Sequence, residues 1–316
     1  MSYYSSLRLL MIIPILLVGV LLFSQQNSKL YYFAVASSHY TKIGNDGLIH
    51  FSDLPDSKYS AEIFKKASLK LGAKKGGMIF SSENNLITEK RIFSSLQSLI
   101  KKIDKDGAKN KLLLIYFCGH GVAEKETKSI FFLPGDFKFD YSKKYEDALQ
   151  KHALNPLKIA QRLNKINPDI KYLLFFDCCY DLEGENSNIN RIDSSEAYIK
   201  SLRQPIVTKN AFLKATEIAR AENLQRKIPT IFAAPPGNSI KFVSSPNSSD
   251  SIFKTGPLAR RFYLIVEDWG EESIKFTYFI KHFMDPTCDP ITNSLFTYFE
   301  WGGDCPWQKV LDFEIK

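Results

Sequence analysis

The sequence predicts an α/β protein, a three-layer sandwich in which a mainly parallel central sheet is flanked by helices. Apolar runs of strand length alternate along the chain with longer segments of helical periodicity, which is typical of parallel strands joined by right-handed crossovers. The 316 residues are 44% hydrophobic and 13% aromatic, which is enough to build a large core.

The expected elements follow one another in a regular order. We expect buried strands over 30–36, 76–82, 171–177 and 228–237, another from residue 111 to the glycines around His120, and a short one within 129–137. The spacing of apolar residues predicts helices over 58–72, 88–103, 156–166, 209–227, 256–269 and 273–284. Thr88 is expected to cap the second helix, and Gly72 to end the first.

The first residues differ from the rest of the chain. An uncharged run, LLMIIPILLVGVLLF at 9–23, follows Arg8 and gives way to polar residues. It is shorter than the ~20 residues of a typical membrane-spanning helix, and no Ala-x-Ala cleavage site is visible. We expect residues 1–28 to be a signal peptide or an N-terminal membrane anchor. Residues 29–316 would then form one exported domain, anchored and facing outward, or periplasmic or secreted if the signal is cleaved.

The distribution of charge argues against a nucleic-acid partner, and the cysteine count allows a disulfide. The formal net charge is +8, but the lysines are spread along the chain and no nucleic-acid-binding motif accompanies them, so we expect no nucleic-acid partner. Five cysteines are present, and in an oxidising compartment Cys288 and Cys305 are one candidate disulfide pair.

Two of the apolar runs end in residues that carry chemistry. KLLLIYFCGHGVAE at 111–124 ends at His120 between two glycines, and KYLLFFDCCYDLEG at 171–184 breaks at Asp177 and two cysteines. Sites in open parallel sheets lie beyond the carboxyl ends of the strands. If these two strands are neighbours, about 4.8 Å apart, the imidazole can stabilise a nucleophilic thiolate. The backbone N–H groups of Gly121 and Cys179 are then placed to hold an oxyanion.

A metal site is the alternative use of Cys118, His120, Cys178 and Cys179. Adjacent residues of an extended chain point to opposite faces, so Cys178 and Cys179 do not suit one ion, and we expect no metal. The same alternation means that only one of these two thiols faces His120.

The two motifs resemble those of a known family. YFCGHG and FFDCCYDLEG are similar to the histidine and cysteine motifs of the caspase and metacaspase cysteine peptidases, often Y-S-G-H-G and D-x-C-x-S-G. The segments LPDSKYSAEIFKKASLKLG, FFLPGD and IPTIFAAPPGNSIKF extend the resemblance over about residues 30–267. It implies a caspase-like sandwich with a p20-type domain.

The resemblance implies roles for particular residues. Cys179 would be the nucleophile and His120 the acid/base, with Gly121 in the oxyanion hole. Asp177 and Cys118 would bind substrate, Asp177 as an acid that lines the pocket for a basic P1 side chain. The polar stretch 183–205 would be a processing-type loop.

The chain also departs from the metacaspase pattern. Tyr180 and Asp181 stand where metacaspases commonly have His and Ser, and Ser57 and Ser60 where their first helix often carries Cys and Asp. A preference for Arg or Lys is therefore a weaker expectation than the peptidase activity itself.

The leading interpretation is a cysteine endopeptidase that cleaves a peptide or protein substrate. The alternative is a catalytically inactive caspase-like binding or scaffold module. No cofactor is expected. Calcium activation stays an open alternative, but no acidic cluster in the sequence indicates a calcium site. Membrane contact is expected only through the N-terminal segment.

Overall fold

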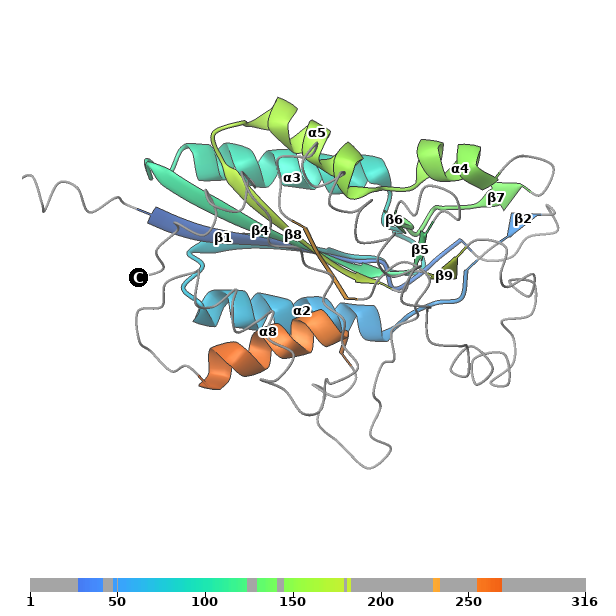
Figure 1. The fold of residues 1–316 in the computed structure, drawn as a ribbon, viewed down its shortest axis with the longest axis horizontal. Coiled ribbons are helices and arrows are strands. Elements are labelled where there is room, and N and C mark those ends of the chain that lie inside the picture. Colours follow the sequence, from blue (N-terminus) through green and yellow to red (C-terminus); the bar gives the residue numbers. More distant parts are fainter. Residues whose placement is uncertain are drawn as a thin grey trace, which may run out of the picture.

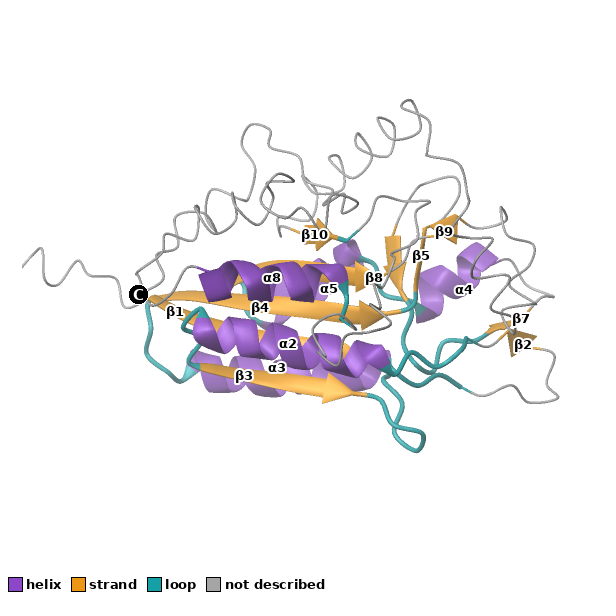
Figure 2. Cartoon of the chain, turned by 90° about the horizontal axis from the view of Figure 1, so that it is seen from below, coloured by secondary structure: helices purple, strands orange, loops and turns teal. Residues whose placement is uncertain are grey.

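The computed structural model describes residues 28–41, 48–49, 51–123, 130–140, 145–178, 181–182, 230–233 and 255–268. Five parallel strands form the central sheet in the spatial order β10-β8-β4-β1-β3 (Figure 2). Their bounds are β1 Ser28–Ala36, β3 Lys75–Phe80, β4 Asn110–Gly119, β8 Lys171–Cys178 and β10 Thr230–Phe232. β4 and β8, which end in the two motifs, are neighbours.

Helices cover both faces of this sheet (Figure 1). α2 (Asp56–Lys70) and α8 (Pro257–Asp268) pack together on one face. α3 (Glu89–Asp104) and α5 (Pro156–Ile166) lie on the other, and α4 (Tyr145–His152) lies beyond them. The predicted three-layer α/β sandwich is confirmed.

Burial on both faces explains the nearly continuous apolar strands. Every residue of β4 from Leu112 to Cys118 is buried, as expected for a parallel strand between two helical layers. The Phe64 ring of α2 stacks on Tyr116 of β4 with centroids 4.6 Å apart, and Phe175 of β8 meets the same Phe64 edge-on.

The ends of the helices follow local signals. The Thr88 hydroxyl accepts the N–H of Arg91 at 3.0 Å, and the Asn155 side chain accepts the N–H of Lys158 at 2.7 Å. Gly72, one residue past the C-cap of α2, has a φ of 97°, which only glycine adopts readily. These predicted caps are confirmed, and Asn155 adds one.

Two small sheets extend the carboxyl end of the central sheet. β2 (Leu48–Ile49) pairs with β7 (Phe139–Asp140), and β5 (Gly121–Ala123) pairs with β6 (Ile130–Phe132) and β9 (Asp181–Leu182). The sequence predicted a strand only where β6 lies.

Several predictions concern segments outside the described residues. These are the leader at 1–28 apart from Ser28, the loop at 183–205, the helices at 209–227 and 273–284, and the cysteines Cys179, Cys288 and Cys305. Within the part of the chain that is described, no helix has the length and apolar character to cross a membrane.

Candidate active site

The candidate site lies at the topological switch point of the sheet, where the strand order reverses. β1 pairs with β3 on one side and β4 on the other, so the chain switches sides between β3 and β4. Loops that leave neighbouring strands on either side of such a switch diverge and open a crevice at the carboxyl edge. Tyr40, four residues after β1, and His120, directly after β4, meet at this edge.

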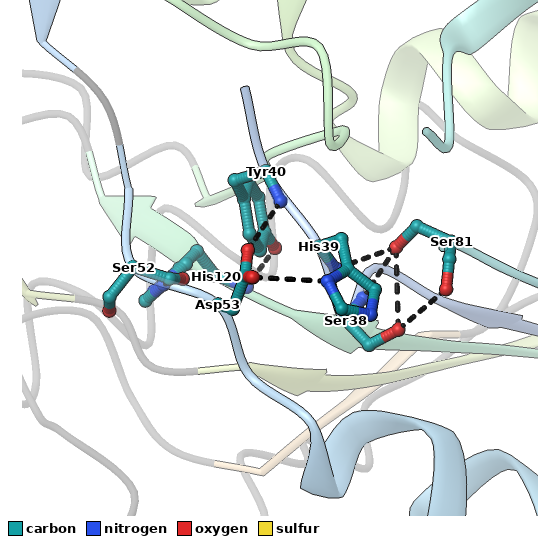
Figure 3. A network of polar contacts seen from close by, with 7 residues as sticks. All are labelled: Ser38, His39, Tyr40, Ser52, Asp53, Ser81 and His120. Carbon is teal, nitrogen blue, oxygen red and sulfur yellow. Dashed lines mark hydrogen bonds and ion pairs between the residues drawn. The ribbon is translucent and has the colours of Figure 1, made fainter. Parts of the chain in front are cut away.

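His120 is held by a backbone carbonyl. Its Nε2 lies 2.9 Å from the carbonyl oxygen of Ser52 (Figure 3). A carbonyl only accepts, so Nε2 carries the proton and Nδ1 is left as the basic nitrogen. The rings of Tyr40 and Phe51 lie 4.8 and 5.1 Å from the imidazole, centroid to centroid.

Partial burial keeps the His120 imidazole in its neutral form. Removal from water lowers the pKa of His120 from 6.5 to about 4, although the Ser52 carbonyl and the Asp53 carboxylate partly oppose the shift. The ring is therefore neutral at pH 7 and has a free lone pair. This is the state that a general base requires.

Asp53 fixes the segment that carries the Ser52 carbonyl. One carboxylate oxygen accepts the backbone N–H of Tyr40 at 2.9 Å, and the other pairs with Nδ1 of His39 at 3.0 Å (Figure 3). Ser81, just after β3, in turn accepts the N–H groups of Ser38 and His39 at 2.7 and 2.8 Å. Three strand ends, those of β1, β3 and β4, are thus tied together around His120.

Tyr40 and Gly119 set the position of the His120 backbone. The buried Tyr40 hydroxyl accepts the N–H of His120 at 2.7 Å. A Cβ on Gly119 would lie 2.7 Å from that hydroxyl oxygen and 3.0 Å from Phe132, so no other residue fits without displacing the contact.

The strand register brings the histidine and cysteine motifs side by side. Gly119 of β4 pairs with Cys178 of β8, and Val122 of β5 pairs with Asp181 of β9, so the pairing offset is 59 residues in both. Cys178 is 1% exposed, with its Sγ 3.8 Å from the carbonyl oxygen of Phe117. Its thiol belongs to the core.

The N–H of Gly121 is directed toward the cysteine side of β5. Phe132 exchanges both of its backbone hydrogen bonds with Leu154, and the His120 carbonyl accepts the N–H of Leu133 on the β6 side. Backbone groups of successive strand residues point to alternate edges. The N–H of Gly121 therefore points to the other edge, where β9 pairs.

Asp177 and Cys118 lie on the sheet face that α2 and α8 cover. Asp177 Oδ2 accepts the hydroxyl of Tyr116 at 2.7 Å and the N–H of Ala259, in the first turn of α8, at 3.1 Å. Asp177 is 0% exposed, and burial raises its pKa to about 6 against the lowering effect of these hydrogen bonds and of Arg260.

Two serines of α2 complete this buried polar cluster. Ser57 and Ser60 are buried beside the Cys118 thiol and act to lower its pKa. The Ser60 hydroxyl donates to the carbonyl of Asp56 at 3.1 Å and accepts the N–H of Gly256 at 2.8 Å. Burial nevertheless raises the pKa of Cys118 to about 12, so this thiol stays protonated at neutral pH. Among the described side chains, no group of three His, Cys, Asp or Glu is arranged to hold a metal ion.

The sequence pattern did not predict Ser52, Asp53 or Tyr40 at this site. Ser52 contributes a backbone carbonyl, which any residue type supplies, and Asp53 and Tyr40 lie in a polar loop without periodicity. The sequence did identify His120, Gly121, Asp177 and Cys118, which lie at the carboxyl edges of β4 and β8.

No protein-family model matches the chain, and no curated protein matches its sequence. Among solved structures, it is similar to protein GSU0716 from Geobacter sulfurreducens, with 11% identity, a TM-score of 0.45, and coverage of 83% of this chain and 90% of that one. It is also similar to Caspase-1 from Spodoptera frugiperda, with 10% identity, a TM-score of 0.39, and coverage of 92% and 86%.

Proposed function

We propose that this protein is a cysteine endopeptidase in which Cys179 is the nucleophile and His120 the general base. The strand register is the observation that carries the proposal. The offset of 59 residues is the same before and after positions 179 and 180, and a chain that keeps it brings Cys179 opposite His120. Cys178 cannot replace it, because its thiol is buried.

The proposed reaction uses the neutral imidazole. Nδ1 of His120 takes the proton of the Cys179 thiol as the sulfur attacks the carbonyl carbon of the scissile peptide bond. The N–H of Gly121 donates to the oxyanion that forms. His120 then gives the proton to the leaving amine as the C–N bond breaks, and water hydrolyses the acyl-enzyme with His120 again as base.

A preference for Arg or Lys at P1 is part of the proposal and depends on Asp177. Asp177 lies beside Cys118 and beside Gly256, whose N–H donates to Ser60, and a buried polar cluster of this kind suits a charged side chain. Asp177 is fully buried beneath the residues that begin α8, so a P1 side chain reaches it only if Gly256 and its neighbours move. Cleavage after Arg by wild type, lost in Asp177→Asn, supports this preference.

Residues 9–23 support a further part of the proposal, that the chain is exported and held at a membrane. The apolar run ends at Phe23, a few residues before β1 starts at Ser28. The domain would then lie on the outer side of the membrane, opposite Arg8.

The deciding experiment measures peptide hydrolysis by the full chain in reductant, with and without calcium. Fluorogenic peptides would end in Arg, Lys, Asp or Leu. We expect Cys179→Ala and His120→Ala each to lower kcat/KM by roughly 1,000-fold or more, and the matched control Cys178→Ala to keep it within a few-fold. Full activity in Cys179→Ala would overturn the proposal. A folded wild type that cleaves nothing would favour the binding module.

A further inference from the structure

Lysines are concentrated at the end of the domain opposite the candidate active site. Strands of the central sheet start there and the helices between them end there (Figures 1 and 2). We call this end the lysine pole. Its described lysines are Lys29, Lys70, Lys74, Lys75, Lys101, Lys102, Lys105, Lys109, Lys111, Lys165 and Lys171.

The fold brings these lysines together from four strands and three helices. Lys29 on β1 pairs in register with Lys111 on β4, and the N–H of Lys74 donates to the carbonyl of Leu30. The turn after α3 is joined to β1 by an ion pair of 2.9 Å between Lys29 and Asp106. Residues far apart in the sequence therefore form one surface. The sequence does not show this cluster, because the lysines are spread evenly along the chain.

Carboxylates balance only part of this charge. Against eleven lysines, the described residues at the pole include five acids: Asp104, Asp106, Asp169, Glu267 and Asp268. Asp106, Glu267 and Asp104 pair with Lys29, Lys70 and Lys111. Ion pairs with a described carboxylate are absent at seven exposed lysines of the pole, which are Lys74, Lys75, Lys101, Lys102, Lys105, Lys109 and Lys165.

Helix dipoles explain some of these lysines but not all. Lys70, Lys101, Lys102 and Lys165 lie in the last turns of their helices, where a positive charge is favourable. Lys74, Lys75 and Lys109 are exposed residues of the turns and strand starts beyond the helices. That favourable effect falls off within the last turn, so their clustering needs another reason.

The apolar N-terminal run joins the domain at this same pole. Phe23 ends the run, and the five residues to Ser28 span at most about 18 Å even when fully extended. A bilayer that takes up residues 9–23 is therefore held close to the lysines, and their attraction to charged headgroups acts over a Debye length of about 8–10 Å. The N-terminal run connects to the start of β1, which lies in the middle of the lysine pole.

We propose that the lysine pole docks on anionic phospholipid headgroups of the membrane that receives residues 9–23. Lysines near such a surface each add to binding, and a cluster of them orients the domain as well as retaining it. The active-site edge then faces away from the bilayer, about 30 Å along strands such as β4. The proposal rests on the proposed membrane anchor and is independent of the peptidase chemistry.

Lysine acetylation read by mass spectrometry tests this on the full chain. The chain is incorporated into vesicles of phosphatidylcholine alone or with phosphatidylglycerol, and recovery with the vesicles tests the anchor. We expect Lys74, Lys75, Lys105 and Lys109 to react at least about fivefold more slowly in the anionic vesicles. Lys90, Lys138 and Lys151, exposed away from the pole, should react equally in both.

Two matched variants separate the position of the charges from their number. Glutamine at Lys74, Lys75, Lys105 and Lys109 should abolish the slower acetylation of Lys101 and Lys102. Glutamine at Lys58, Lys90, Lys138 and Lys151, which lie away from the pole, changes the charge equally and should leave the slower acetylation of Lys101 and Lys102 intact.

Three results would overturn the proposal. One is equal reaction of the pole lysines in the two kinds of vesicle, and another is a full chain that stays outside all vesicles. The third is protection by double-stranded DNA but not by anionic vesicles, which would assign the pole to a nucleic-acid polyanion. Loss of peptidase activity in Cys179→Ala bears on none of these results.

Discussion

The Nε2 atom of His120 is bonded to the carbonyl oxygen of Ser52 at 2.9 Å, across 68 residues of sequence. This contact selects the tautomer of the imidazole and leaves Nδ1 as its basic nitrogen. The carbonyl itself cannot be removed by mutation, but the side chain that fixes its segment can. That side chain is Asp53, through its contacts with His39 and Tyr40.

Asp53 is a positioning residue in the proposed peptidase. Asp53→Ala frees the segment and should lower kcat roughly 10 to 100-fold with little change in KM, because the imidazole is no longer held in one orientation. Asp53→Asn keeps an acceptor for the Tyr40 N–H and should recover part of the loss. Asp147→Asn, an equal charge change on exposed α4, is the control. A KM effect of the same size as the kcat effect would contradict a positioning role.

The pH profile should report the burial of His120. Because its pKa is lowered to about 4, the base stays neutral down to that pH, and the acid limb of kcat/KM should fall well below the ordinary 6.5. Phe51→Ala uncovers one face of the ring, whose centroid lies 5.1 Å away, and should move the limb upward toward 6.5. The measurement is kcat/KM from pH 4 to 8. If the acid limb of wild-type kcat/KM lay at pH 6.5 and Phe51→Ala left it there, burial would not control the protonation of His120.

His120 and Asp177 should act oppositely on stability between about pH 4 and 6. The unfolded chain binds more protons at His120, because the folded pKa is lowered, so this residue makes the free energy of unfolding rise with pH. The folded chain binds more protons at Asp177, whose pKa is raised to about 6, so Asp177 makes the free energy of unfolding fall with pH. Each effect amounts to about 3 kcal/mol over this range.

Single variants should separate the opposite pH dependences of stability that His120 and Asp177 produce. Asp177→Asn leaves the His120 term, and its stability should rise with pH relative to wild type, whereas His120→Gln should make stability fall with pH. Urea denaturation at half-unit steps from pH 4 to 7 gives these curves. Parallel curves for wild type and both variants would show that neither group is buried as described.

The parts of the molecule that the sequence predicted are those set by periodicity and local capping. β4, α3 and the cap at Thr88 have strong patterns, and tertiary packing agrees with them. His120 and Asp177 were found because they interrupt apolar strands. The Ser52 contact and the lysine pole were not, because each depends on segments that only the folded chain brings together.

Gly119, whose φ is 158°, should be irreplaceable for activity, whereas Gly107, whose φ is also positive, should not. In Gly119→Ala the new methyl group would lie 2.7 Å from the Tyr40 hydroxyl, which accepts the His120 N–H. We expect a stability loss of about 1–3 kcal/mol and a drop in kcat/KM of at least about tenfold, because the His120 backbone must shift. Gly107→Ala is the matched control, since Gly107 has a φ of 71° and nothing within 4 Å of the added Cβ. Gly107→Ala carries a backbone cost of about 1–2 kcal/mol but lies at the opposite end of β4, so its activity should equal that of wild type. Equal activity losses in the two variants would mean that the rate follows global stability and not the position of His120.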